Sequence, residues 1–293
     1  MTERMLMLLL AQVVKLATPL LIAALGETMA ESTGVVILAL DGIIMLSAMV
    51  AFAVNFSTAS LLLGIVAGAL IGLGLAAVFA LIAVNQERDQ YATGLIIGTL
   101  AIGIANYLGN PFIGKTAGTM PDLPILNGVP VFGGFLNQSL FTYFSYLAVA
   151  LIAYYLYRTR PGITTRAVGA NVEAAIRRGL PTKRIQVLAV LAAGLMAGLA
   201  GAAFTLDTKP GWTQNQTLGW GWLALTIVIF GQRNPLCVTV GAYLFTFLSA
   251  ATIVQIFFPV LPAQLTGVAP YVMMLVVLVI ASFWQRSRQR RLA

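Results

Sequence analysis

The stretch Ala59–Val84 reads ASLLLGIVAGALIGLGLAAVFALIAV and contains no charged side chain. A helix needs about 20 apolar residues to cross the hydrocarbon core of a bilayer, so this stretch alone predicts a membrane-spanning helix. Its glycines recur at four-residue steps, at Gly64, Gly68 and Gly72. Small residues at this spacing let helix backbones approach closely inside a membrane. The stretch therefore predicts one helix of a tightly packed bundle.

The rest of the 293-residue chain has the same character, with 59% hydrophobic and 9% charged residues. Soluble proteins average about 25% charged residues, so this chain lacks the charge to cover a water-facing surface. We predict an all-α fold, a polytopic membrane helix bundle of eight to ten transmembrane helices, in a single domain over residues 1–293. The best count is nine, with segments at Met5–Leu25, Val35–Phe52, Ala59–Val84, Tyr91–Leu108, Ser139–Tyr157, Ile185–Leu206, Leu218–Phe230, Pro235–Phe258 and Gly267–Trp284.

Two of the nine segments have features that interrupt a simple span. Leu218–Phe230 is short, and Met5–Leu25 contains Lys15 and Pro19. Non-helical backbone at membrane depth is tolerated where it is buried in protein or lines a cavity. We therefore expect broken or re-entrant helices at these two places.

The positive charges indicate how the chain is oriented. Lys and Arg total 17 against 9 Asp and Glu, and segment 158–184 together with the tail 286–291 holds most of the excess. Lys and Arg collect in cytoplasmic loops, so both regions, and the C-terminus, are predicted to be cytoplasmic. Attraction to membrane lipids explains this basicity better than a nucleic-acid partner, because the stacking aromatics that single-strand binding uses are missing from these regions.

Composition also excludes several kinds of chemistry. The chain has no His and one Cys, so a His/Cys zinc cluster and a Ser-His-Asp triad cannot form. Gly109–Thr116 matches the phosphate-loop pattern G-x-x-x-x-G-K-T. That pattern needs a preceding strand and a following helix, whereas here a membrane helix precedes it and prolines follow. We expect no catalytic residue, no metal and no cofactor on this chain.

Segment 158–184 contains a short predicted helix, Gly169–Pro181, with the sequence GANVEAAIRRGLP. An Asn can cap the helix, an acid lies in its positive first turn, two Arg lie in its last turn, and a Gly ends it. Such a helix either inserts into a groove of a cytoplasmic protein or rests on anionic lipid. The predicted contact residues are Gly169, Asn171, Glu173, Ala174, Ala175, Arg177, Arg178 and Gly179.

Asp41 lies inside an apolar run. A carboxylate there costs about 2.5–3.5 kcal/mol on insertion scales, so such acids face a cavity or a partner. Asp41 is either a polar point on a solute path or the acceptor of a hydrogen bond between helices, and we favour the second. Glu27 and Glu31, one turn apart at the inner end of the first segment, either meet a cytoplasmic partner or pair with Arg.

Three blocks resemble the binding-protein-dependent ABC importer permeases of the branched-chain amino acid and simple sugar type. The first is G-x-N-x-x-A-A-x-x-x-G at 169–179 with the small-residue helix Ala189–Gly201 after it. The others are Leu25–Val35 with Asp41–Leu46, and Ala224–Pro235. Within that family the spacing is most similar to the nucleoside (basic membrane lipoprotein-dependent) permeases. The chain departs from the pattern at Ile37, where Asn is usual, and at Asp41, where Glu is usual.

The resemblance implies a multi-pass permease half of an importer in the bacterial cytoplasmic membrane, not an enzyme itself. It would move a small polar solute, most readily a nucleoside, by alternating access. ATP and Mg²⁺ would be bound by a separate ATPase that meets the 169–179 helix, and a second permease half and an external binding protein would complete the importer. Asp41, Trp220 and Trp222 are the candidate translocation path. Alternatives are a sugar or branched-chain amino acid permease, an ion-coupled secondary transporter and, least supported, an intramembrane enzyme.

Overall fold

The computed structural model describes residues 3–122, 138–249 and 272. In these ranges the chain is helical apart from loops and one isolated β-bridge between Asp122 and Ser139. The helices are α1 (Glu3–Glu31), α2 (Leu40–Thr58), α3 (Leu61–Phe79), η1 (Ala80–Asn85), α4 (Gln90–Gly109), η2 (Asn110–Phe112), α6 (Leu140–Arg158), α7 (Arg160–Ala170), α8 (Val172–Arg177), α9 (Thr182–Ala203), η3 (Phe204–Thr208), α10 (Trp220–Phe230) and α11 (Pro235–Ser249).

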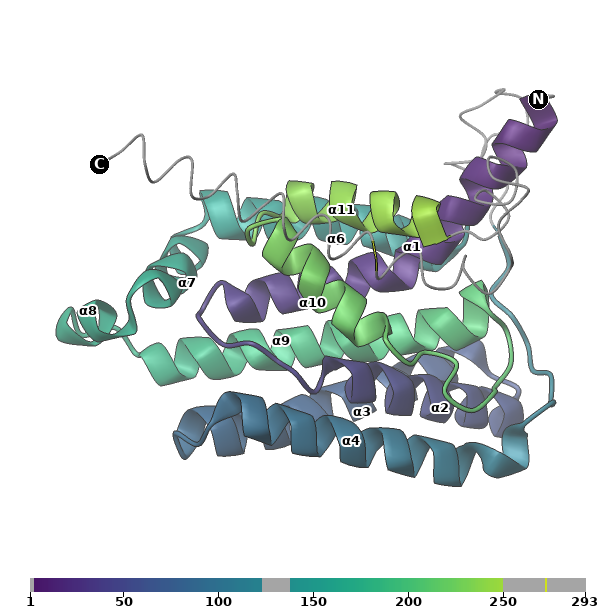
Figure 1. The fold of residues 1–293 in the computed structure, drawn as a ribbon, viewed down its shortest axis with the longest axis horizontal. Helices are drawn as coiled ribbons and strands as arrows, with labels where there is room; N and C mark the ends of the chain where they lie inside the picture. Colours follow the sequence, from purple (N-terminus) through teal and green to yellow (C-terminus); the bar gives the residue numbers. More distant parts are fainter. Residues whose placement is uncertain (1–2, 123–137, 250–271, 273–293) are drawn as a thin grey trace.

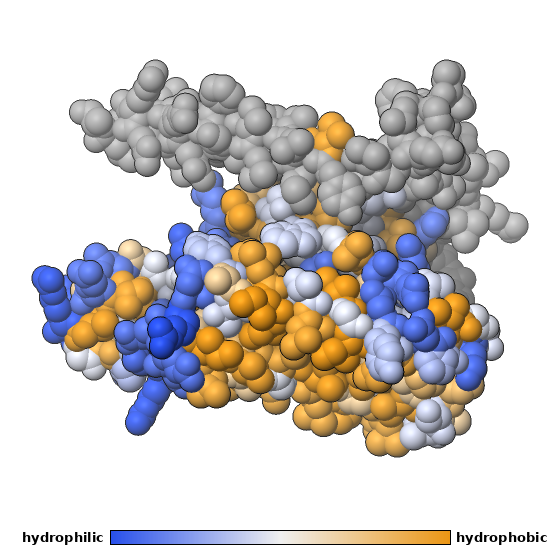
Figure 2. All heavy atoms as spheres, turned by 60° about the horizontal axis from the view of Figure 1, so that its bottom comes forward, coloured by the Kyte–Doolittle hydropathy of each residue, from blue (hydrophilic) through white to orange (hydrophobic). Residues whose placement is uncertain are grey.

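Six helical stretches in the described part are long and apolar enough to cross a membrane: Leu10–Glu31, Leu40–Thr58, Leu61–Asn85, Gln90–Phe112, Leu140–Arg158 and Thr182–Thr208. The long helices run side by side (Figure 1). Hydrophilic residues gather at both ends of the bundle, with an apolar band between them (Figure 2). The membrane-bundle class is confirmed, whereas the count of nine is not. The Gly267–Trp284 segment, the end of the Pro235–Phe258 segment and the basic tail lie outside the described residues.

Burial separates central from peripheral helices. In the most apolar part of each span, 83% of the residues are buried in α1 but only 33% in α6 and in the span that begins with α3. Close packing of α3 on α9 explains the glycine spacing in the opening stretch. A Cβ at Gly72 would lie 2.3 Å from the carbonyl oxygen of Gly194, a distance that no side chain tolerates. The glycine seam therefore joins a peripheral helix to a central one.

The expected break in the first segment is wrong, because α1 is one continuous helix. Pro19 has no N–H to donate to the carbonyl four residues back, at Lys15. The hydroxyl of Thr208 donates to that carbonyl instead, at 3.1 Å. The Lys15 ammonium is also paired with Asp122 and Asp207, at 3.1 Å each. The neighbouring residues Asp207 and Thr208 thus pair with the Lys15 charge and with the carbonyl that Pro19 leaves free, the two features that predicted a break.

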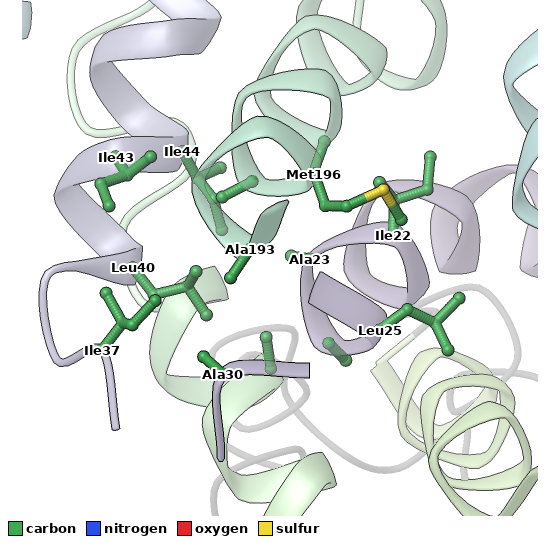
Figure 3. Packing of buried hydrophobic residues seen from close by; sticks show 14 of the residues in the cluster. Ile22, Ala23, Leu25, Ala30, Ile37, Leu40, Ile43, Ile44, Ala193 and Met196 are labelled. Atoms are coloured by element: carbon green, nitrogen blue, oxygen red, sulfur yellow. The ribbon is translucent and has the colours of Figure 1, made fainter. Parts of the chain in front are cut away.

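The predicted Val35–Phe52 helix begins later than expected, at Leu40. Residues 32–39 leave the end of α1 and return into the bundle as turns and extended chain before α2 starts (Figure 1). The N–H of Ile37 donates to the Glu27 carboxylate at 2.9 Å. Ile37 and Leu40 both lie in the buried apolar cluster with Ala193 of α9 (Figure 3). Residues 32–39 can enter the bundle as non-helical chain because a side chain, that of Glu27, accepts a backbone N–H that a helix would otherwise pair.

Candidate functional site

The start of α2 lies at mid-depth in the bundle. A Cβ at Gly42 would lie 2.2 Å from the carbonyl oxygen of Gly98, and Gly98 is near the middle of α4. Asp41, the residue before Gly42, is 4% exposed. The carboxylate is thus placed halfway across the bundle, where a free charge is most costly.

The Asp41 carboxylate caps the start of another helix, α10. Its Oδ1 accepts from the N–H of Gly221 at 2.9 Å, and its Oδ2 accepts from the N–H of Gly219 at 3.2 Å. Gly219 occupies the N-cap position and has no side chain with which to cap the helix. A negative charge there also complements the positive end of the helix dipole. Asp41 therefore joins the N-termini of two helices, α2 and α10, that both begin inside the bundle.

The glycines on either side of Trp220 make this junction possible. A Cβ at Gly221 would lie 2.2 Å from the backbone nitrogen of Asp41. Gly219 has φ +89°, a left-handed conformation that glycine adopts without strain. The Gly-Trp-Gly pattern at 219–221 was the sequence signal for this junction. The sequence predicted Asp41 as an acceptor between helices, but it did not predict the partner helix.

The two predicted path tryptophans differ in their surroundings. Trp220 packs edge-on against Phe204, with ring centroids 4.7 Å apart. Trp222 is 42% exposed on the face of α10 that also carries Ile229. The structure brings Asp41 and both tryptophans into one junction, and Trp222 is the more exposed of the two tryptophans.

Amide side chains line the end of the bundle at which α4 terminates. Asn106 donates to the Oδ1 of Asn215 at 2.7 Å, and Gln214 donates to the Oδ1 of Asn110 at 2.6 Å. These four residues, of which Asn106 is half-buried and the others are exposed, join the end of α4 to the loop that leads into α10. Trp212 in the same loop is buried, 1% exposed, so it belongs to neither an interfacial aromatic belt nor a solute-stacking surface.

The helical arm of segment 158–184 lies at the opposite end of the bundle (Figure 1). It consists of two helices rather than the single predicted one, α7 and then α8. The Oδ1 of Asn171 accepts from the N–H of Ala174 at 2.9 Å, which is the predicted cap. At the other end Gly179 has φ +75°, and the N–H of Leu180 donates to the carbonyl of Ala175 at 3.1 Å. This hydrogen bond is typical of a Schellman termination.

The arm packs on the loop between α1 and α2. A Cβ at Gly169 would lie 2.2 Å from the carbonyl oxygen of Ser32. Within α8, Ala175 is buried whereas Ala174 is exposed, so these two alanines do not form one free face. Glu173 and Arg177 are 87% and 83% exposed and 4.0 Å apart, a separation at which the pair stabilises the helix weakly. The exposed surface of α8 combines the charged Glu173 and Arg177 with the apolar Ala174 and Ile176.

Two further contacts lie at the same end of the bundle as the arm. Lys183, at the start of α9, lies 2.6 Å from Glu87 in the loop before α4. The hydrogen bond and charge of Lys183 lower the pKa of the exposed Glu87 carboxyl. Arg233 donates to the carbonyl of Glu31 at 3.3 Å. Glu27 is fully buried, and its carboxylate accepts a hydrogen bond from the N–H of Ile37. The two expectations for Glu27, contact with a cytoplasmic partner or an ion pair with Arg, are therefore both wrong.

The end of the bundle away from the arm holds a charged cluster that the sequence did not predict. Lys15 bridges Asp122 and the buried Asp207, and Ser139 donates to Asp207. A buried ion pair is stable only when its geometry and further hydrogen bonds compensate desolvation. Here four segments meet to provide them. The signal was a lysine, Lys15, in the first predicted span, together with an aspartate, Asp207, directly after the sixth predicted segment.

Within residues 3–122, 138–249 and 272, no group of three His, Cys, Asp or Glu side chains is placed to hold a metal ion. The phosphate-loop lookalike at 109–116 follows α4 and continues as a three-residue 3-10 turn and loop. Neither the strand nor the helix that such a loop needs is present at this position.

Comparison with known proteins identifies the chain's relatives. The permease component of branched-chain amino acid transport systems matches residues 9–278. A Haloferax volcanii protein assigned provisionally as a glucose ABC transporter permease is 33% identical over 83% of this chain and 76% of its own length. The nucleoside ABC transporter permease NupC of Lactococcus lactis is 28% identical over 93% of this chain and 92% of its own length. The guanosine ABC transporter permease NupQ of Bacillus subtilis is 26% identical over 89% of this chain and 88% of its own length.

No solved structure matches the chain. The family match covers most of the sequence, and the relatives in three organisms are all transport subunits. The apolar helices agree with that assignment. The chain belongs to the branched-chain amino acid type of ABC transporter permeases, as a multi-pass membrane subunit of the sugar and nucleoside importer kind.

Proposed function

We propose that this chain is one transmembrane half of an ATP-driven importer that moves a nucleoside into the cytoplasm by alternating access. ATP and Mg²⁺ belong to a separate ATPase, and a second permease half and an external solute-binding protein complete the transporter. The single observation that carries the solute class is the state of Asp41. Both of its carboxylate oxygens are occupied by the α10 amides.

A neutral solute fits this junction better than an amino acid. Two acids, Asp41 and Glu27, are buried inside the bundle, and each carboxylate accepts backbone N–H groups, that of Asp41 from the start of α10 and that of Glu27 from Ile37. An amino acid carries an ammonium and a carboxylate that need free partners when they leave water. A nucleoside needs a ring face and hydrogen-bonding groups, which Trp222 and the outer amides offer. The two nucleoside-permease relatives support the same choice.

A sugar is the second candidate, because the relative assigned to glucose transport is 33% identical. Uptake of radiolabelled adenosine and uridine by cells that express the complete importer separates the two. We expect nucleosides to compete with each other and glucose and leucine to compete at least tenfold more weakly. Glucose competing better than nucleosides would refute the nucleoside assignment and leave the permease assignment intact. Uptake driven by a proton gradient without ATP would refute both.

Substitution of Trp222 tests whether this residue lies on the proposed nucleoside path. We expect Trp222→Ala to raise the KM for nucleosides about tenfold, since stacking on an aromatic ring contributes about 1–3 kcal/mol per base. Trp222→Phe retains a ring face and restores most of the affinity. Ile229→Ala, a truncation on the same helix face, is the control. A KM in Trp222→Ala equal to that of the control contradicts the role of Trp222.

The arm at 158–184 is the proposed ATPase contact. Arg177→Glu with Arg178→Glu reverses two exposed charges on α8 without burying either one. We expect this double variant to fold, to keep binding protein docking, and to lose stimulation of ATP hydrolysis by the solute-loaded binding protein. Arg88→Glu, in the loop before α4 at the same end, is the charge-reversal control. Unchanged coupling in the double variant refutes the contact.

A further inference from the structure

A groove of 410 Å³ lies between the arm and the bundle. Its walls come from α7 and the start of α9, and the ends of α1 and α6 close it, with Met29, Tyr155, Pro161, Ile185 and Leu188 among the lining residues. Leu188 is 67% exposed. The spans that contribute Tyr155 and Leu188 end nearby, at Arg158 and Thr182, so the groove lies at the level where acyl chains meet headgroups.

The groove offers no free hydrogen-bonding side chain in the described lining. The hydroxyl of Thr164 donates to the carbonyl of Arg160 at 2.9 Å, and that of Thr165 donates to the carbonyl of Pro161 at 2.9 Å. The hydroxyl of Tyr155 lies 3.1 Å from that of Thr165. A polar solute would leave its own groups unsatisfied there, whereas an acyl chain needs only apolar contact.

Two arginines each lie one helical turn before a lining residue of the groove. Arg160 precedes Thr164 by four residues in α7, and Arg184 precedes Leu188 by four residues in α9, so each shares a helix face with a lining residue. Both are exposed. In the described part of the chain neither has an acidic side chain within 4.0 Å. An apolar groove with two unpaired cations at its mouth is complementary to an amphiphile with a negative head.

We propose that an anionic phospholipid of the inner leaflet occupies this groove. Its acyl chain lies along Ile185 and Leu188, and its phosphate pairs with Arg160 and Arg184. The lipid then connects α7 to α9, and so connects the arm to the bundle. This proposal rests on the cytoplasmic orientation of the arm, and it does not depend on which solute is transported.

Native mass spectrometry of the full chain, released from nanodiscs with equal phosphatidylglycerol and phosphatidylcholine, tests the proposal. We expect the wild type to retain one phosphatidylglycerol in preference to phosphatidylcholine. Arg160→Gln with Arg184→Gln should lower that preference by roughly 25-fold, at roughly fivefold per basic residue near an anionic lipid surface. Arg177→Gln with Arg178→Gln, an equal loss of charge in the same arm, should leave it unchanged.

A second variant tests the apolar part. Leu188→Trp fills the groove from an exposed position, and it should lower retention of both lipids while size exclusion and thermal unfolding stay as in the wild type. Free glycerol phosphate should not displace the lipid. Equal retention of the two lipids by the wild type, or equal effects of the two double variants, refutes the proposal. Two other outcomes would assign the groove to a protein partner and so refute the proposal. One is displacement of the lipid by added ATPase, and the other is loss of self-association in Leu188→Trp with lipid retention unchanged.

Discussion

Asp41 provides the sharpest test of the mid-membrane junction. Its carboxylate accepts two backbone hydrogen bonds, at 2.9 and 3.2 Å, from the first residues of α10. Hydrogen bonds to charged groups contribute about 1.5–3 kcal/mol each. Asp41→Ala keeps the Cβ and removes both acceptors, so we expect it to lower the free energy of unfolding by about 3–6 kcal/mol. Asp41→Asn keeps one acceptor oxygen and should lose about half of that.

The assay is unfolding of the purified chain in mixed micelles by titration with sodium dodecyl sulfate, followed by circular dichroism. Ser57→Ala is the control, because Ser57 is an exposed residue at the other end of α2 and its loss should change stability by less than about 0.5 kcal/mol. The expected order of stability is wild type and Ser57→Ala, then Asp41→Asn, then Asp41→Ala. Asp41→Ala as stable as the control would refute the capping role. A nucleoside KM that rises in Asp41→Asn beyond what its stability explains would show that the carboxylate also meets the solute.

Three further predictions concern packing, pH and the arm. Gly72→Ala should destabilise the chain by about 1–3 kcal/mol in the same titration, because its Cβ would meet a carbonyl oxygen of α9 at 2.3 Å, whereas Gly74→Ala, with nothing within 4 Å, should not. Because Lys183 lowers the pKa of Glu87 in the folded state, their pair stabilises the chain above the usual pKa of glutamate. That contribution is lost as pH falls through the lowered pKa, so the wild type should exceed Glu87→Gln in stability at neutral pH and converge with it in acid. Asn171→Ala should cost about 1 kcal/mol of local stability, and hydrogen exchange of the amide that it caps should quicken about fivefold; an unchanged rate would contradict the cap.

Local sequence patterns predicted the parts of this chain whose structure depends on neighbours along the chain. Asn171 caps α8 and Gly179 ends it because both hydrogen bonds close within the same short helix. Ala59–Val84 spans the bundle because its apolar length leaves no other stable conformation in lipid. The positive arm and the family resemblance were likewise readable without coordinates.

Tertiary contacts decided where helices begin, and they overruled local signals. Pro19 and Lys15 predicted a break in α1, yet α1 is continuous because Thr208, almost two hundred residues later, takes the orphaned carbonyl. Val35–Phe52 predicted a full helix, yet α2 starts at Leu40 because Glu27 accepts the N–H of Ile37.

The candidate site shows the same division. The sequence by itself determined that a costly carboxylate at Asp41 needs a partner, since burial of an unpaired charge in an apolar run is unfavourable wherever the run lies. Only the tertiary structure decided that the partner is the start of α10, 178 and 180 positions along the chain. The physical reason is that backbone amides carry no sequence signature. Any helix start exposes unpaired N–H groups, and packing alone determines which of them comes within hydrogen-bonding distance of a given carboxylate.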